Sequence, residues 1–195
     1  MHGLINRGIQ RFVTDSYGEA KWRAAMKHAG MDFVDFEAMW IYDDAVTPAV
    51  LAAVCDVLER PYEELLEDIG TYLVSHSNVE ALRRLLRFGG VTFVDFLHSL
   101  DELPDRARLA VADLDLPRLE LVEVNAEQYS LRCYSDMPGW GHLFIGVLRA
   151  MADDYGDLAF LDHQGVSAGA ETLQITLLET EFASGRGFEL GARTA

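Results

Sequence analysis

A proline interrupts a long helical pattern in the middle of this chain. Apolar residues recur at helical spacing from Val91 to Ala112, and Pro104 lies well inside that stretch. A proline inside a helix removes a backbone N–H donor and clashes with the preceding turn, at a cost of about 3 kcal/mol. The helix must therefore kink, end or restart near Leu103.

The first half of the chain has helical periodicity and clear helix-start signals. Helix starts are predicted at the capping box formed by Ser16–Glu19, at Thr47–Pro48, at Pro61 and at Asn78. Between these starts the apolar residues recur every three or four positions. This half is therefore expected to consist of helices.

After Pro117 the apolar period changes to two, which is typical of strands. Residues 119–124 and 129–134 are expected to form a hairpin, and residues 143–151 a helix. Two further strands are predicted at 158–161 and 172–178. The sequence thus predicts an α+β fold, in which a helical N-terminal half packs on a smaller C-terminal antiparallel sheet with a helix.

Length and charge limit the possible classes of protein. With 195 residues, half of them hydrophobic, the chain can bury one sizeable core, so a single domain is expected over residues 1–183, with a loose tail at 184–195. The formal net charge of −16 argues against nucleic acid and an anionic membrane surface as partners, because both attract cationic proteins.

The sequence shows no sign of membrane insertion or export. No apolar run approaches the roughly 20 residues that span a bilayer, and the first residues do not form a signal peptide, so a cytoplasmic location is expected. Cys55 and Cys133 have no metal-type spacing and are expected to be reduced thiols.

Enzyme motifs are missing, so no catalytic role is predicted. The chain has no Gly-rich phosphate loop and no nucleophile elbow, and its histidines do not have metal-ligand spacing. Acidic pairs at Asp43–Asp44, Glu63–Glu64 and Asp153–Asp154 are interpreted as solvated surface groups.

Several short segments, taken in order, resemble the haem-nitric oxide/oxygen-binding (H-NOX) family, which includes the gas-sensing domain of soluble guanylate cyclase. They are Met1–Asn6, Leu100–Leu103, Leu116–Leu119 and Pro138–Leu148. The resemblance covers nearly the whole chain. It implies the H-NOX fold, a haem b cofactor and a role in signalling.

The chain departs from this family at the residues expected to hold haem. In the family, the residue after the Leu-Asp-Glu-Leu run is the histidine that ligates iron, and here it is Pro104. The family's Tyr-x-Ser-x-Arg motif, which clamps the haem propionates, aligns with Cys133, Ser135 and Met137. Only the serine is kept, and Asp136 would repel a propionate.

The resemblance also assigns a set of apolar residues to the haem pocket. On periodicity alone the same residues are ordinary core, and both interpretations stay open. If haem binds, Ile9 and Leu73 stand where some members carry hydrogen-bond donors for oxygen, so nitric oxide is favoured. The full set is Ile5, Ile9, Leu73, Leu97, Leu100, Leu143, Phe144 and Leu148.

Two histidines are candidates for a substitute axial ligand. His98 precedes Pro104 by six positions, about 120° around a helix, so it cannot simply replace a ligand there. The resemblance places His142 at the start of a helix that borders the far side of the haem, which makes it the stronger candidate of the two.

The sequence therefore predicts an H-NOX-like sensory or regulatory domain in which haem b is absent or weakly bound. The resemblance implies that such a domain acts through a protein partner, such as a histidine kinase or a cyclic-dinucleotide enzyme. Two alternatives remain: a carrier or sensor of a different tetrapyrrole or apolar ligand in the same pocket, and a haem sensor of nitric oxide with another axial ligand.

Overall fold

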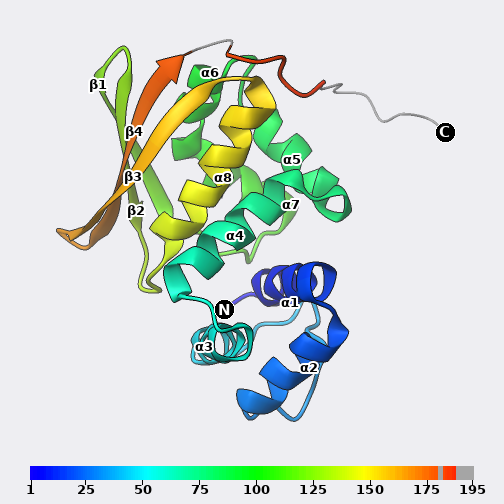
Figure 1. The fold of residues 1–195 in the computed structure, drawn as a ribbon. Helices are drawn as coiled ribbons and strands as arrows, with labels where there is room; N and C mark the ends of the chain where they lie inside the picture. Colours follow the sequence, from blue (N-terminus) through cyan, green and yellow to red (C-terminus); the bar gives the residue numbers. More distant parts are fainter. Residues whose placement is uncertain (180–181, 188–195) are drawn as a thin grey trace.

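The computed structural model describes residues 1–179 and 182–187. In this part of the chain a run of helices is followed by a hairpin, a helix and a second hairpin (Figure 1). The α+β class predicted from the sequence is confirmed. The helices are α1 (Gly3–Tyr17), α2 (Glu19–His28), α3 (Val46–Leu58), α4 (Tyr62–Ser75), η1 (Ser77–Val79), α5 (Glu80–Arg87), α6 (Phe93–His98), η2 (Leu100–Glu102), α7 (Leu103–Ala110) and α8 (Trp140–Tyr155), and the strands are β1 (Arg118–Asn125), β2 (Gln128–Tyr134), β3 (Leu158–Ser167) and β4 (Ala170–Glu179).

Two hydrophobic cores divide the molecule. One lies among α1, α2, α3 and α4 and contains Trp22 and Phe36, while the other lies between α8, the sheet and α6 and contains Leu148. Ile5 and Leu143 pack against both cores. In Figure 1 the first three helices form a lobe on the side of α4 that faces away from the sheet.

Helices α4 and α8 cross at van der Waals distance because each has a glycine at the crossing. A Cβ added at Gly70 would lie 2.0 Å from the Leu143 carbonyl oxygen, and one added at Gly146 would lie 2.0 Å from the Glu67 carbonyl oxygen. Any larger residue would force the two backbones apart. This contact fixes how the two halves of the molecule are joined.

The sheet follows the predicted alternation of apolar residues. In the described residues it has the strand order β1-β2-β4-β3, with every neighbouring pair antiparallel. Leu131 pairs with Leu121 on one side and Leu173 on the other, and this inward face packs on α8. Because side chains alternate across a strand, the polar residues between them face outward.

Pro104 marks the restart of a helix and is not in the interior of one. The expected stretch 91–112 is divided into α6, η2 and α7, and Pro104 lies in the first turn of α7. The first N–H groups of a helix have no partner within it, so a proline there loses no helical hydrogen bond. The predicted interruption is confirmed, but a strained mid-helix proline is absent from this stretch.

Three predicted helix caps are wrong. Ser16 lies inside α1, and α2 begins after Gly18, whose φ is 89°. Thr47 lies inside α3, where its hydroxyl donates to Asn6 Oδ1 at 2.7 Å. The Asn78 side-chain amide donates to Asp15 and does not cap α5. In each case a tertiary partner or a neighbouring helix overrides the local capping signal.

Asp154 is buried, although the sequence suggested a solvated carboxylate. Its side chain accepts from Arg83 Nε at 2.8 Å and from Arg83 Nη2 at 3.1 Å, and both residues are nearly inaccessible to solvent. Only its neighbour Asp153 is exposed. A buried charge is stable in a fold when it is paired and hydrogen-bonded in this way.

The first residues of the expected tail are held by hydrogen bonds. The Arg186 N–H donates to the Asp154 carbonyl at 2.8 Å, and Arg83 Nη2 donates to the Gly187 carbonyl at 3.3 Å. The remainder of that tail, residues 188–195, lies outside the described residues. Within the described part of the chain, no helix has both the length and the apolarity to cross a bilayer.

Candidate functional site

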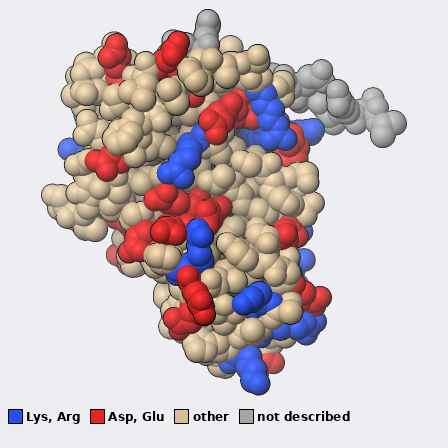
Figure 2. Space-filling view, in the orientation of Figure 1, with Lys and Arg blue, Asp and Glu red and all other residues tan. Residues whose placement is uncertain are grey.

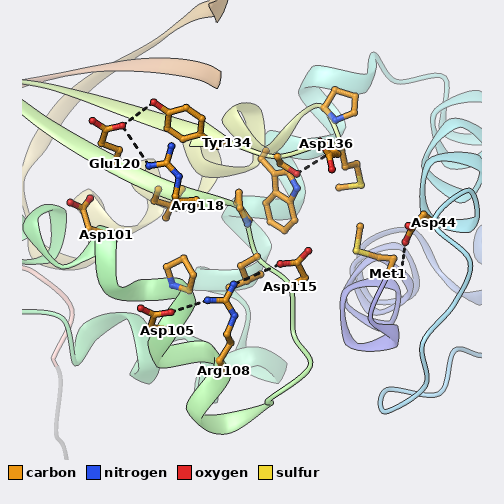
Figure 3. A pocket seen from close by; sticks show the side chains of 18 of the residues that line it. Met1, Asp44, Asp101, Asp105, Arg108, Asp115, Arg118, Glu120, Tyr134 and Asp136 are labelled. Atoms are coloured by element: carbon orange, nitrogen blue, oxygen red, sulfur yellow. Dashed lines mark hydrogen bonds and ion pairs between the residues drawn. The ribbon is translucent and has the colours of Figure 1, made fainter. Parts of the chain in front are cut away.

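A cavity of about 870 Å³ lies where the helical lobe meets the C-terminal half (Figure 3). This volume is within the usual range for small-molecule sites. Both halves of the chain contribute to its wall, which contains residues from the chain start, α3, η2, α7, β1, β2, the turn before α8 and the first residue of α8. The lining residues are Met1, Asp44, Pro48, Asp101, Pro104, Asp105, Arg108, Asp115, Leu116, Pro117, Arg118, Leu119, Glu120, Tyr134, Ser135, Asp136, Met137, Pro138 and Trp140.

Three of the residues that the sequence assigned to the site line this cavity. Pro104 belongs to the wall at the start of α7, and Ser135 and Met137 belong to the segment after β2. The position at which the motif comparison expected a ligating histidine is therefore on the wall of this cavity.

Cys133 lies elsewhere, inside the core beneath the sheet. It pairs with Leu119 in β1 and with Glu171 in β4, and it is 2% exposed. Burial, followed by the nearby charge of Glu171, raises the pKa of Cys133 to about 12. This thiol is therefore kept neutral and away from the cavity.

The eight apolar pocket candidates lie in the two cores and not on the cavity wall. The structure places Ile9 and Leu73 with the lobe core, and Leu97, Leu100, Phe144 and Leu148 with the sheet core, while Ile5 and Leu143 contact both. This placement agrees with the interpretation that these residues are ordinary core.

His142 also lies away from the cavity lining. Its ring stacks on His163 with 4.2 Å between centroids, and its Nδ1 lies 3.4 Å from Glu67 Oε1. His163 Nδ1 accepts from the Gly165 N–H, so its Nε2 carries the proton that is donated to Glu171. His142 is thus part of a polar contact between α8, α4 and β3.

Carboxylates dominate the polar part of the cavity wall. Asp44, Asp101, Asp105, Asp115, Glu120 and Asp136 line it, against the arginines Arg108 and Arg118. Arg108 lies 2.8 Å from Asp105 and 3.8 Å from Asp115, and Asp44 lies 2.6 Å from the Met1 amino group. Figure 2 shows acidic and basic side chains interspersed on one face of the molecule, with a group of acidic ones across its middle.

Arg118 and Tyr134 are lining residues that the sequence interpretation missed. They face each other in the β1–β2 register, and the Arg118 guanidinium carbon lies 3.7 Å from the centre of the Tyr134 ring. The Tyr134 hydroxyl donates to Glu120 Oε2 at 2.9 Å. Tyr134 occupies a variable position inside the motif, and Arg118 is on the other strand, so only the strand register could have revealed the pair.

A model of the haem-NO-binding family matches residues 2–159 of this sequence. The chain belongs to the haem-NO-binding family. The predicted H-NOX resemblance is thereby confirmed.

Curated relatives of this family member include soluble guanylate cyclases from invertebrates. The soluble guanylate cyclase gcy-31 of Caenorhabditis elegans is 25% identical over 154 residues, which are 79% of this chain and 22% of that protein. The soluble guanylate cyclase 89Db of Drosophila melanogaster is 21% identical over 155 residues, which are 80% of this chain and 23% of that protein. The chain thus spans less than a quarter of the length of these relatives.

Solved H-NOX structures share the fold. The Fe(II) unliganded H-NOX protein from K. algicida superimposes with a TM-score of 0.80 at 15% identity, and the match covers 92% of this chain and 98% of that one. An oxygen-binding H-NOX domain related to soluble guanylate cyclases gives a TM-score of 0.72 at 18% identity, and this match covers 96% of this chain and all of that one.

The cavity of this H-NOX domain does not fit haem as other proteins hold it. Haem iron takes an axial imidazole, thiolate or phenolate, and a thioether serves as a ligand together with an imidazole, as in cytochromes c. The described lining residues include no histidine and no cysteine, their one tyrosine donates to Glu120, and their sulfur atoms are the thioethers of Met1 and Met137.

Proposed function

We propose that this chain is an H-NOX sensory or regulatory domain that acts through a protein partner and has lost the standard ligation of haem. The observation that carries the proposal is Pro104 on the cavity wall at the first turn of α7. A proline side chain offers no lone pair to iron. The domain is not itself catalytic, in keeping with its family, which is named for ligand binding.

The partner belongs to a signalling class such as a histidine kinase or a cyclic-dinucleotide enzyme. Support comes from the curated relatives, in which the matched region is a small part of a longer cyclase. A cytoplasmic location is part of the same proposal and agrees with the free thiols of Cys55 and Cys133.

The haem content of the purified chain tests this proposal. After expression with haem supplementation, pyridine haemochrome analysis is expected to give far less than one haem per chain. A stoichiometric value would overturn the proposed loss of ligation. The Soret band of a His142→Ala variant would then decide whether His142 is the axial ligand.

A gain-of-function variant tests the same proposal from the other side. Pro104→His combined with Met137→Arg puts an imidazole and an arginine on the cavity wall, and haem uptake is expected to rise. Because Pro104 is in the first turn of a helix, Pro104→His should change the free energy of unfolding by no more than about 1 kcal/mol. Cys133→Tyr is left out, because a tyrosine at this buried position would overpack the core.

A second candidate function is the binding of another small molecule in the same cavity. The volume of about 870 Å³ favours it, since a cavity of this size remains beside Pro104. Such a ligand would be a tetrapyrrole of another kind or a smaller apolar molecule. The absorbance spectrum of the purified protein separates these outcomes, because a tetrapyrrole other than haem absorbs at other wavelengths.

A further inference from the structure

Two hydrogen-bond donors meet on one wall of the cavity. Arg118 from β1 and Tyr134 from the end of β2 are direct partners in the strand register, while the hydroxyl of the next lining residue, Ser135, accepts from the Met137 N–H. Arg118 and Tyr134 both line the cavity. The guanidinium of Arg118 lies over the Tyr134 ring at 3.7 Å, which fixes the plane in which its N–H groups point.

This group already holds a carboxylate of the protein itself. Glu120 Oε2 accepts from the Tyr134 hydroxyl at 2.9 Å and lies 3.8 Å from Arg118 Nη1 (Figure 3). Glu120 Oε1 lies 3.7 Å from Arg132 Nη1, on the other side. Glu120 therefore shows which chemical group the wall recognises, because an arginine and a hydroxyl together are donors for a carboxylate.

The remainder of the cavity limits what such a ligand can look like. Pro104, Leu116 and Trp140 supply apolar wall, which suits an apolar body. Asp105 and Asp115 lie around Arg108 and neutralise it, so a second anionic group would find no free cation there. The ligand should therefore have one anionic group and not two.

We propose that Arg118 and Tyr134 bind the single anionic group of an amphiphilic ligand whose apolar body fills the cavity. In the unliganded protein Glu120 takes the place of that group and competes with it. This inference rests on the second proposed function, the binding of a small molecule in this cavity. It names the ligand class as a mono-anionic amphiphile.

Two fluorescent probes that differ by one group test the proposal on the full chain. The first probe is 8-anilino-1-naphthalenesulfonate, and the second is N-phenyl-1-naphthylamine, which is the same aryl amine without the sulfonate. Arg118→Gln is expected to weaken binding of the sulfonate probe about tenfold, since Arg118 is 64% exposed and its charge is partly screened. Binding of the neutral probe should change less than twofold.

A matched control comes from the same sheet. Arg132→Gln removes the same charge and the same contact with Glu120, but Arg132 does not line the cavity, so it should leave the sulfonate probe within twofold. Glu120→Gln removes the competing carboxylate and is expected to tighten binding of the sulfonate probe severalfold. Tyr134→Phe should weaken it and serves as a second test should Arg118→Gln fail to fold.

The outcomes are distinct from those of the haem test. Equal affinities of the sulfonate probe for the Arg118→Gln and Arg132→Gln variants would overturn the anion site, as would failure of the folded chain to bind either probe. Neither probe contains a metal, so the result does not depend on an axial ligand. A protein that takes up stoichiometric haem would refute the proposed loss of ligation and still leave the probe titration to decide the anion site.

Discussion

The buried ion pair between Arg83 in α5 and Asp154 in α8 gives the sharpest prediction about stability. The two side chains are 4% and 3% exposed and are joined by two hydrogen bonds. Burial alone would lower the pKa of Arg83, but the hydrogen bonds and charges of Asp154 and Glu80 raise it overall, so the arginine stays charged in the fold. Asp154→Ala therefore leaves a charged guanidinium buried without its main partner.

The expected loss from Asp154→Ala is about 3 kcal/mol of unfolding free energy. Removing one partner of a buried pair costs about 3–5 kcal/mol. The lower end applies here because Glu80 Oε1 remains 3.1 Å from Arg83 Nη1. Such a loss is large, because the free energy of unfolding of a typical domain is only about 5–15 kcal/mol.

Urea denaturation followed by far-UV circular dichroism measures this loss. Asp153→Ala is the matched control, because its side chain is exposed and the change should stay within about 0.5 kcal/mol. The double variant Arg83→Met with Asp154→Leu should be more stable than Asp154→Ala, since it also removes the buried Arg83 charge, although Arg87, whose Nε lies 3.6 Å from Asp154, loses that contact in both variants. Ordinary substitutions change the free energy of unfolding by ~1 kcal/mol. The reasoning would be refuted if the unfolding free energies of Asp154→Ala and Asp153→Ala differed by no more than that.

Three further predictions concern packing, thiol chemistry and pH. Gly146→Ala should lower the free energy of unfolding by about 1–3 kcal/mol, because the new carbon would lie 2.0 Å from a backbone oxygen of α4. Gly8→Ala, whose new carbon would lie 4.0 Å from its nearest neighbour, should raise it by about 0.5–1 kcal/mol. Equal urea midpoints of the two variants would contradict the close crossing of α4 and α8. Cys133, with its pKa raised to about 12 by burial, should react with a maleimide at neutral pH only after unfolding, and rapid labelling of a native Cys55→Ser variant, which keeps Cys133 as its one thiol, would contradict this placement. The pKa of Asp15 is lowered in the folded protein, chiefly by the hydrogen bond from Tyr72. Its stabilising effect is therefore fully present above the pKa of an aspartate in the unfolded chain, about 4, and is lost as the pH falls through the lower pKa of the folded state. The difference in unfolding free energy between the unchanged protein and the Asp15→Asn variant should therefore shrink on acidification. A difference that stays constant with pH would count against a stabilising role of the Asp15 carboxylate.

The elements were largely predictable, while their caps were not. The alternation after Pro117 identified both hairpins, and Pro104 identified the break between α6 and α7. Thr47 misled the prediction because its hydroxyl is used by Asn6, a residue 41 positions away. A capping signal is worth only about 1 kcal/mol, so a buried tertiary hydrogen bond can override it.

The candidate site was predictable only at the positions that a motif fixes. Pro104, Ser135 and Met137, which the resemblance assigned to the haem site, line the cavity, whereas Cys133 and the apolar candidates lie in the cores. Arg118 and Tyr134 were missed, since a motif compares positions along the chain and these two meet across a strand pair.

The sequence by itself determined which parts of this chain are helical and which are extended, and that the helical stretch 91–112 is interrupted near Pro104. These properties follow from the sterics of neighbouring residues, which act within a few positions of the chain. The tertiary structure decided that Arg83 meets Asp154 across 71 positions, that glycines let α4 and α8 touch, and that Arg118 stacks on Tyr134. Those contacts depend on which surfaces are buried together, and burial is a property of the whole folded chain.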